Sequence, residues 1–407
     1  MKFKTLFFIA LFVIFATNTT SLYLDFLKLT SQEINYGLFK TKNIYDKNDY
    51  IVLKLSNNDI TFWTSMPTNE QNISIGDNLY LYYFTNKIDF FSYIKGFYTK
   101  SFDIVKQQKE IETFDKIKNH ITNQHENPLI SQLYSAIFLS TAISKELRDI
   151  CVDFGVSHLV AISGFHLGVL TFILYWSVFI LYNYFHKRYF PYRNIKFDIV
   201  VFSFFVLFLY LYLLGIVPSL LRAYVMGVFA LILHRSNIKI ISFYSLFTIV
   251  VIILSFMPSL IFSLSLWLSI FGVFYIFLFI KYFSKQNKIF LFFFFNIWIY
   301  LSLSPIIFYI FEVASIHQLY SPIVSILFSV FYPLSLFLHI IGFGGLFDDM
   351  LLWWFEIKST IFDITISPYF IGLYLLVSLL SITNKKSFWL LNILMIGNFI
   401  YFLNSNI

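Results

Sequence analysis

The sequence predicts a multi-pass α-helical membrane protein with a small extracytoplasmic β-domain near the N-terminus. Of the 407 residues, 58% are hydrophobic and only 13% are charged, and the mean hydropathy is +0.73. Soluble globular proteins carry about 25% charged residues, so most of this chain must lie in lipid. A stretch near the N-terminus that is rich in β-forming residues predicts the β-domain.

Basic residues are concentrated in short loops between apolar runs. A net charge of +7 and a pI of 9.1 could suggest nucleic-acid binding. However, short basic loops between membrane spans mark the cytoplasmic side, so we interpret the charge mainly as a topology signal. The loop residues are Lys2 and Lys4; Lys187, Arg188, Arg193 and Lys196; Arg235 and Lys239; Lys281, Lys285 and Lys288; Lys385 and Lys386.

The first apolar run, about residues 5–17, follows Lys2 and Lys4. It resembles a signal peptide in length and charge, but no small-residue A-x-A-like cleavage site follows it. We therefore predict that residues 1–17 are a retained membrane anchor. The N-terminus would then lie in the cytoplasm, and residues 18–128 would lie outside.

Residues 18–100 are predicted to form the β-domain. Short stretches such as 49–57 and 59–66 contain many β-formers and are separated by turn residues, which is typical of a small barrel or sandwich. Residues 101–150 are predicted to be an amphipathic and interfacial helical region. Within it, residues 129–144 are apolar but too short to cross a bilayer comfortably.

Residues 151–404 are predicted to form a polytopic membrane core. About 20 apolar residues are needed to cross the ~30 Å hydrocarbon layer. The apolar runs that alternate with the basic loops are 157–182, 197–214, 217–234, 240–256, 260–280, 289–311, 367–383 and 387–404.

Run 319–341 would disturb this alternation if it crossed the bilayer fully. It contains Pro322 and Pro333 and ends in GFGG, so we predict a re-entrant or broken segment. Residues 346–362 would then be an amphipathic helix at the outer surface, with Trp353 and Trp354 among the headgroups. An ordinary crossing with a topology exception remains the alternative.

Polar residues enter the first span of the core, in DFGVSHLVAISGFHLGVL (153–170). Protonatable groups at that depth are costly and usually face a cavity or a pathway. On a continuous helix, His158 and His166 would lie ~12 Å apart along the axis, so we predict no shared metal ion. Pore lining and interhelical hydrogen bonding both remain open. Gly164 and Gly168, together with Ser163, could instead serve close helix packing.

Two segments, SHLVAISGFHLGVL (157–170) and PSLLRAYVMGVFALILHR (218–235), and the order of parts resemble the ComEC-type competence proteins. The first segment is similar to the family's His-containing run that ends in Ser-Gly-aromatic/Leu-His. The second segment is similar to its pattern of Pro, Arg-Ala and Met closing on a basic residue. The third feature is the order of parts, namely an anchor, a β-domain similar to an OB-fold, short helices and a membrane core.

The resemblance implies an inner-membrane channel through which single-stranded transforming DNA reaches the cytoplasm. Longer family members carry a C-terminal metallo-β-lactamase-like domain, but this sequence contains no HxHxDH-type cluster. It also contains no G-x-x-x-x-G-K-[ST] motif for an ATPase. We therefore expect a channel without catalytic activity, cofactor or metal. The lone Cys151 precludes an intramolecular disulfide.

The same resemblance implies several partners besides single-stranded DNA and membrane lipid. They are an extracytoplasmic DNA-delivery receptor and a cytoplasmic ATP-driven helicase or translocase, and a homo-oligomer is a further option. Arg222, which follows Pro218 by one helical turn, would contact phosphate near the pore mouth. The alternative is that its side chain extends to the outer interface.

The β-domain would guide the strand by stacking bases on aromatic rings beside basic residues. Because side chains alternate along a strand, half of these rings must instead point into the barrel. The candidates are Phe62, Trp63, Tyr80, Tyr82 and Tyr83, with Lys54 and Lys87 nearby.

Two other function classes are compatible with the sequence. A secondary transporter would also use broken helices and buried polar groups. An intramembrane hydrolase could use Ser163 as its nucleophile, with His158 or His166 as the base.

Overall fold

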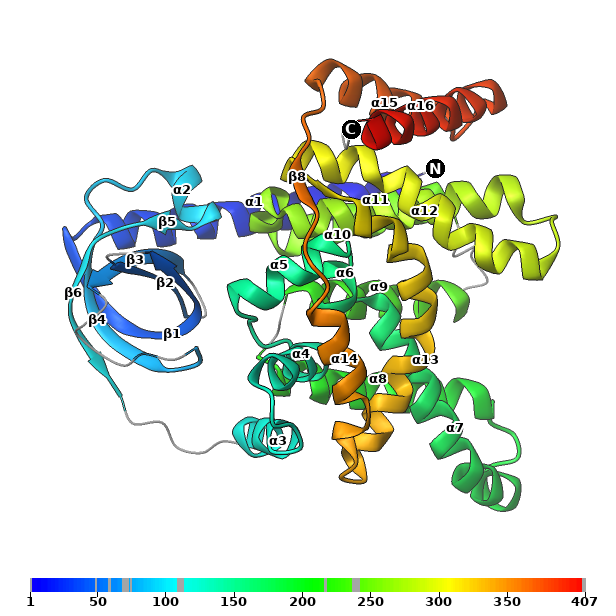
Figure 1. The fold of residues 1–407 in the computed structure, drawn as a ribbon, viewed down its shortest axis with the longest axis horizontal. Coiled ribbons are helices and arrows are strands. Elements are labelled where there is room, and N and C mark those ends of the chain that lie inside the picture. The colour runs from blue at the N-terminus through cyan, green and yellow to red at the C-terminus, as the bar shows by residue number, and fades with distance from the viewer. Residues whose placement is uncertain are drawn as a thin grey trace. The chain divides into compact units, whose positions relative to one another are not determined.

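The computed structural model describes residues 2–47, 50–57, 60–67, 73, 75–107, 113–215, 218–235 and 242–404. The chain divides into two compact units. The first contains Met1–Asp115 and Phe247–Trp267, and the second contains Lys116–Leu246 and Leu268–Ile407. Figure 1 shows the elements of both units.

The first unit begins with one long helix, α1 (Lys2–Thr30). No proline or glycine interrupts this stretch, so the helix continues well past residue 17, where we predicted the anchor to end. Its last turns pack on the β-domain through Phe26 and Leu29. Asn18 donates a hydrogen bond to the carbonyl of Ser255 at 2.8 Å, within the same unit.

The predicted β-domain is confirmed as a six-stranded sheet with the order β5-β3-β2-β1-β4-β6. Neighbouring strands are antiparallel except β3 and β5. The strands are β1 (Ile34–Lys47), β2 (Tyr50–Ser56), β3 (Thr61–Pro67), β4 (Asn78–Phe84), β5 (Phe97–Tyr98) and β6 (Ser101–Lys106), with helix α2 (Phe90–Lys95) before β5. The sheet thus begins later than residue 18 and extends beyond residue 100.

A two-residue connection joins the two edge strands of this sheet. The edge strands β5 and β6 are separated only by Thr99 and Lys100. The Thr99 amide donates to the carbonyl of Trp63 at 2.9 Å, and the Thr99 hydroxyl donates to the carbonyl of Phe84 at 2.7 Å. The sheet therefore curls around its apolar core (Figure 1), which includes Phe39, Leu53, Leu55, Phe62, Leu79, Leu81 and Tyr83.

The second unit opens with the short helices α3 (Thr113–Thr122, shared with the first unit), α4 (Pro128–Leu139), α5 (Lys145–Asp153) and α6 (Ser157–Val160). The predicted helical region is therefore present from residue 113, but strand β6 occupies 101–106. Helix α4 starts at a side-chain cap, since Asn127 Oδ1 accepts from the Leu129 amide at 2.8 Å. It buries most of its side chains within the protein.

Apolar helices build most of the rest of the chain, as expected for a multi-pass membrane protein. They are α7 (Gly164–Tyr189), α8 (Ile195–Leu213), α9 (Pro218–Arg235), α10 (Phe243–Phe256), α11 (Leu264–Phe283), α12 (Lys288–Phe311), α13 (Ser321–Ile340), α15 (Pro368–Leu380) and α16 (Lys385–Asn404). Seven helices in the described part of the chain are long and apolar enough to cross a membrane. They are α1, α7, α8, α11, α12, α16 and the stretch Ile316–Ile340 that contains α13.

Residues 313–363 differ from the prediction in two ways. Helix α13 runs continuously through Pro333, so the predicted broken segment is not seen. The predicted helix at 346–362 is shorter, because η3 (Gly344–Phe347) and α14 (Asp348–Phe355) are followed by strand β8 (Ile361–Asp363). Strand β8 pairs with β7 (Val313–Ser315), which precedes η2 (Ile316–Tyr320).

Candidate polar site in the membrane core

The motif at 157–170 contains a helix break. Helix α6 ends at Val160, Ser163 has an extended backbone with φ −128°, and α7 begins at Gly164. The Ser163 amide donates to His166 Nδ1 at 3.1 Å, and the Ser163 hydroxyl lies 3.1 Å from the same nitrogen. His166 therefore satisfies a donor at the start of α7 that would otherwise be unpaired.

The ring of His166 is 1% exposed. Because Nδ1 accepts a hydrogen bond, the proton of a neutral ring must sit on Nε2. Nε2 is buried and has no hydrogen-bond partner among the described residues. Instead, the ring packs edge-to-face against Tyr332 of α13 with centroids 4.6 Å apart. An N–H group that faces an aromatic ring is only weakly stabilised there. The Nε2–H group of His166 is therefore able to donate a stronger hydrogen bond to a polar group.

His158 makes polar contacts through both of its ring nitrogens. Its Nδ1 is 3.1 Å from the carbonyl of Gly155, and its Nε2 is 3.3 Å from the hydroxyl of Ser325 on α13. His158 and His166 therefore contact α13 at different points. Among the described residues, no group of three or more His, Cys, Asp or Glu side chains is placed to hold a metal ion.

The two motif segments pack together through α7 and α9. A β-carbon at Gly164 would lie 3.9 Å from Cβ of Ala223, which is an ordinary contact. Arg222, next to Ala223, is 5% exposed. Pro218 is the first residue of α9.

Gly168 does not support the predicted close helix packing. A β-carbon there would have no atom within 4 Å. Gly155, just before the motif, is the more constrained position. It has φ +63°, and a β-carbon would lie 3.2 Å from Cγ of Gln318.

A second polar cluster forms around Asp153, just before the motif, and the sequence did not predict it. The carboxylate of Asp153, which is buried, accepts hydrogen bonds from the Ser315 hydroxyl at 2.6 Å and from His317 Nδ1 at 2.8 Å. It also accepts from the Thr360 amide at 3.2 Å. The cluster joins the end of α5 to β7 and to the residues before β8. The only sequence signal was a carboxylate immediately before the motif.

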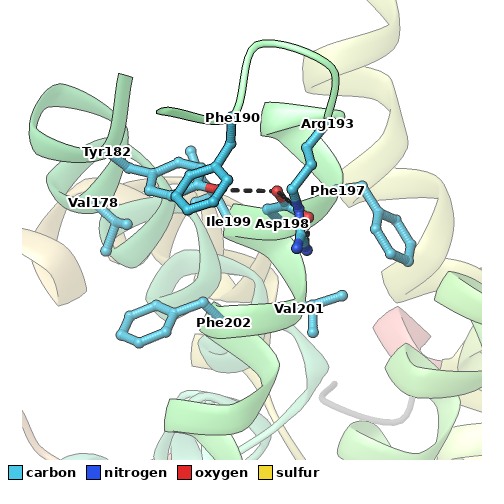
Figure 2. A pocket seen from close by; sticks show the side chains of 9 residues that line it. All are labelled: Val178, Tyr182, Phe190, Arg193, Phe197, Asp198, Ile199, Val201 and Phe202. Atoms are coloured by element: carbon cyan, nitrogen blue, oxygen red, sulfur yellow. Dashed lines mark hydrogen bonds and ion pairs between the residues drawn. The ribbon is translucent and has the colours of Figure 1, made fainter. Parts of the chain in front are cut away.

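A pocket of about 400 Å³ lies between α7 and α8 (Figure 2). Its polar groups pair with one another. Tyr182 donates to Asp198 Oδ2 at 2.9 Å, and Arg193 donates to both carboxylate oxygens at 2.8 and 2.9 Å. The other lining residues are apolar, namely Val178, Phe190, Phe197, Ile199, Val201 and Phe202. The pocket thus offers no uncommitted polar side chain.

The aromatic candidates of the β-domain separate into two groups. Phe62 and Tyr83 stack on each other in the core of the sheet, with centroids 4.8 Å apart. A buried ring cannot stack on a base, so we withdraw these two residues as DNA contacts. Trp63, Tyr80 and Tyr82 are half-buried.

The basic candidates lie at different places. Lys54 Nζ lies 5.0 Å from the centroid of the Trp63 ring, and Lys87 is exposed. The structure therefore brings Lys54 and Trp63 together, whereas no contact joins Lys87 to this pair among the described residues.

A family model described as "Competence protein" matches residues 140–405, which include both motif segments. No curated protein and no solved structure matches the chain.

Proposed function

We propose that this chain, which belongs to the competence protein family, forms the path by which single-stranded DNA crosses the inner membrane in natural transformation. Membership of the family indicates a role in natural competence and DNA uptake. The observation that carries the channel proposal is the packing of α7 on α9, which joins the two motif segments. His166 and Arg222 are both buried on these helices.

The chemistry of these residues suits a polyanion. Ionisable side chains within membrane segments are costly, and they commonly mark the route of an ion or substrate. Arginine is always charged and presents several donors that match phosphate oxygens. In this proposal Arg222 contacts a phosphate group of the passing strand. His166 Nε2–H provides a neutral donor close to the helix break.

The β-domain supports the proposal with an outward-facing aromatic row. Tyr36 lies opposite Tyr82 in the β1–β4 pair, and Tyr82 lies opposite Phe102 in the β4–β6 pair. The ring centroids of Tyr36 and Tyr82 are 5.7 Å apart, and those of Tyr82 and Phe102 are 5.5 Å apart. Tyr36 is 64% exposed. Exposed rings in a row can stack on successive bases. The strand order and the joined edges fit an OB-like barrel, which we place on the outer side of the membrane.

The proposal assigns no catalytic step and no energy source to this chain. A negative-inside potential opposes DNA import by about 2.3 kcal/mol per charge per 100 mV. An ATP-driven helicase or translocase would therefore pull the strand from the cytoplasm, and an extracytoplasmic receptor would deliver it. The basic loops would face the cytoplasm.

The decisive experiment is a deletion in the native organism, scored for transformation and for the location of labelled DNA. We expect transformation to be lost and DNA to accumulate outside the inner membrane. Complementation with Arg222→Gln should fail, whereas Arg222→Lys should restore part of the activity. Arg188→Gln, which changes an exposed arginine of α7, is the matched control and should complement fully. Normal transformation in the deletion strain would refute the proposal.

One contact favours a second candidate, an intramembrane hydrolase. The Ser163 hydroxyl lies 3.1 Å from His166 Nδ1, which is the spacing of a nucleophile and its base. However, the same nitrogen accepts from the Ser163 amide, and His166 Nε2 has no carboxylate partner among the described residues. Full activity of Ser163→Ala in the complementation assay would exclude the hydrolase.

A further inference from the structure

Two histidine rings and a carboxylate meet in the second unit, away from the motif at 157–170. His125 lies in the turn between α3 and α4, His339 lies in the last turn of α13, and Asp348 begins α14. The two Nε2 atoms are 2.9 Å apart. His125 Nδ1 lies 2.9 and 3.0 Å from the two oxygens of Asp348, and His339 Nδ1 lies 2.7 Å from the carbonyl of Ser335.

The partners of these nitrogens determine how many protons the cluster holds. Each Nδ1 atom faces an oxygen acceptor, so each must carry a proton to form its hydrogen bond. The two Nε2 atoms face each other, and two lone pairs at 2.9 Å would repel. One further proton must therefore lie between them. The pair then holds three ring protons, one more than two neutral imidazoles hold.

No arrangement with two protons satisfies all these contacts. Moving the His339 proton to Nε2 leaves a bare Nδ1 against the Ser335 carbonyl. Moving the His125 proton to Nε2 leaves a bare Nδ1 against Asp348, unless that carboxyl is itself protonated. In that case the cluster again holds three protons. A lone pair held against a buried acceptor loses a hydrogen bond and adds repulsion.

The surroundings keep the rings in this geometry. The side chain of His125 is fully buried, and that of Asp348 is 19% exposed. The Tyr134 ring stacks on the His125 ring with centroids 4.6 Å apart, and its centroid lies 4.4 Å from that of the His339 ring. Gln124 donates to the His339 carbonyl and accepts from the Gly344 amide.

The other titratable groups that face the cluster are few. Tyr134 approaches from α4, and His120 Nε2 lies 3.1 Å from the His339 carbonyl. A metal ion between the rings is less well supported than a proton. Tetrahedral ligation at about 2.0–2.1 Å per bond would separate the two nitrogens by more than 2.9 Å. The described residues also provide no third His, Cys, Asp or Glu ligand there.

We propose that His125, His339 and Asp348 form a buried proton-binding clip that fixes the turn between α3 and α4 to the junction of α13 and α14. Above pH ~6.5 the unfolded histidines are mostly neutral and bind fewer protons than the clip does. The contribution of the clip to stability therefore decreases as pH rises further. Below that pH both unfolded rings take up a second proton, which the clip cannot do. Its contribution therefore decreases in acid as well, with a maximum near pH 6.5.

Nitrogen NMR of the ¹⁵N-histidine-labelled wild-type protein tests the clip without any substitution. An N–H···N bond between two imidazoles gives a scalar coupling between their nitrogens. Among the described residues, His125 and His339 are the only two imidazole rings whose nitrogens lie within hydrogen-bonding distance of each other. We expect this coupling at pH 7, and we expect it to be lost at alkaline pH. Its absence at pH 7 would overturn the proposal.

Thermal unfolding against pH provides a second test. In Asp348→Asn the neutral amide no longer stabilises the extra positive charge. The alkaline decrease in melting temperature should therefore begin at lower pH than in the wild type. The matched control is Asp198→Asn, which removes a carboxylate of similar exposure that pairs with an arginine. It should leave that part of the curve unchanged. Equal curves for Asp348→Asn and wild type, or a large loss of stability with a chelator, would overturn the proposal.

Discussion

Gly155 and Gly168 are close in the sequence, but only one of them needs to be glycine. Gly155 has φ +63°, and an added β-carbon would crowd Gln318. We expect Gly155→Ala to lower the free energy of unfolding by about 1–3 kcal/mol. An L-residue is strained at this positive φ, and the Gln318 side chain must also move. Gly168 lies within α7 with open space beside it, so Gly168→Ala should be neutral or slightly stabilising.

Thermal unfolding of the two variants in the same detergent checks this difference. A strongly destabilised Gly168→Ala would show that another chain covers this face of α7. If Gly168→Ala keeps its stability but loses transformation, the open space itself would be part of the DNA path.

The thiol of Cys151 should react very slowly with thiol-labelling reagents in the folded protein. Burial raises the pKa of its thiol to about 12. At pH 8 only about one thiol in 10⁴ is then ionised, against about a quarter for a free cysteine of pKa ~8.5. We expect maleimide to label the native chain very slowly and the unfolded chain rapidly. Ser31→Cys in a Cys151→Ala background places a thiol at an exposed position and should label quickly. Rapid labelling of native wild type would show that α5 opens.

At the scale of whole elements, the aromatic row across β1, β4 and β6 makes a quantitative prediction. Stacking contributes about 1–3 kcal/mol per base, so Tyr36→Ala should weaken binding of single-stranded DNA about 5- to 150-fold. The measurement is fluorescence anisotropy with a labelled oligonucleotide and the full chain in detergent. Tyr98→Ala is the matched control, because Tyr98 is similarly exposed on β5 and hydrogen-bonds Ser65 instead. Equal losses in both variants would contradict a specific stacking row.

The elements that the sequence predicted well are those defined by local patterns. Helices α12 and α16 each begin at a lysine and cover the mainly apolar runs 289–311 and 387–404 that the sequence predicted as spans. Local periodicity determines such elements because each depends on its own residues and on lipid. The β-strands were likewise indicated by β-formers between turn residues, although their pairing order was not.

Contacts between distant segments could not be predicted. Strand β8 exists because residues 361–363 pair with 313–315, so the amphipathic pattern of 346–362 was misleading. His125 and His339 are brought together by the packing of α4, α13 and α14, and neither has a distinctive sequence neighbourhood. The exposed Tyr36 and Phe102 were missed for the same reason, since a row across three strands requires their register.

At the scale of the whole molecule, a passive channel must obey the membrane potential. In vesicles that contain only this protein, we expect a labelled single-stranded oligonucleotide to enter when the interior is positive. It should not accumulate when the interior is negative, because each transferred charge then costs about 2.3 kcal/mol per 100 mV. Potassium gradients with valinomycin set either sign, and protein-free vesicles and Arg222→Gln vesicles measure leakage. Accumulation against the potential without nucleotide would show that the chain couples transport to an energy source of its own. In that case a cytoplasmic ATPase would not be required to pull the strand.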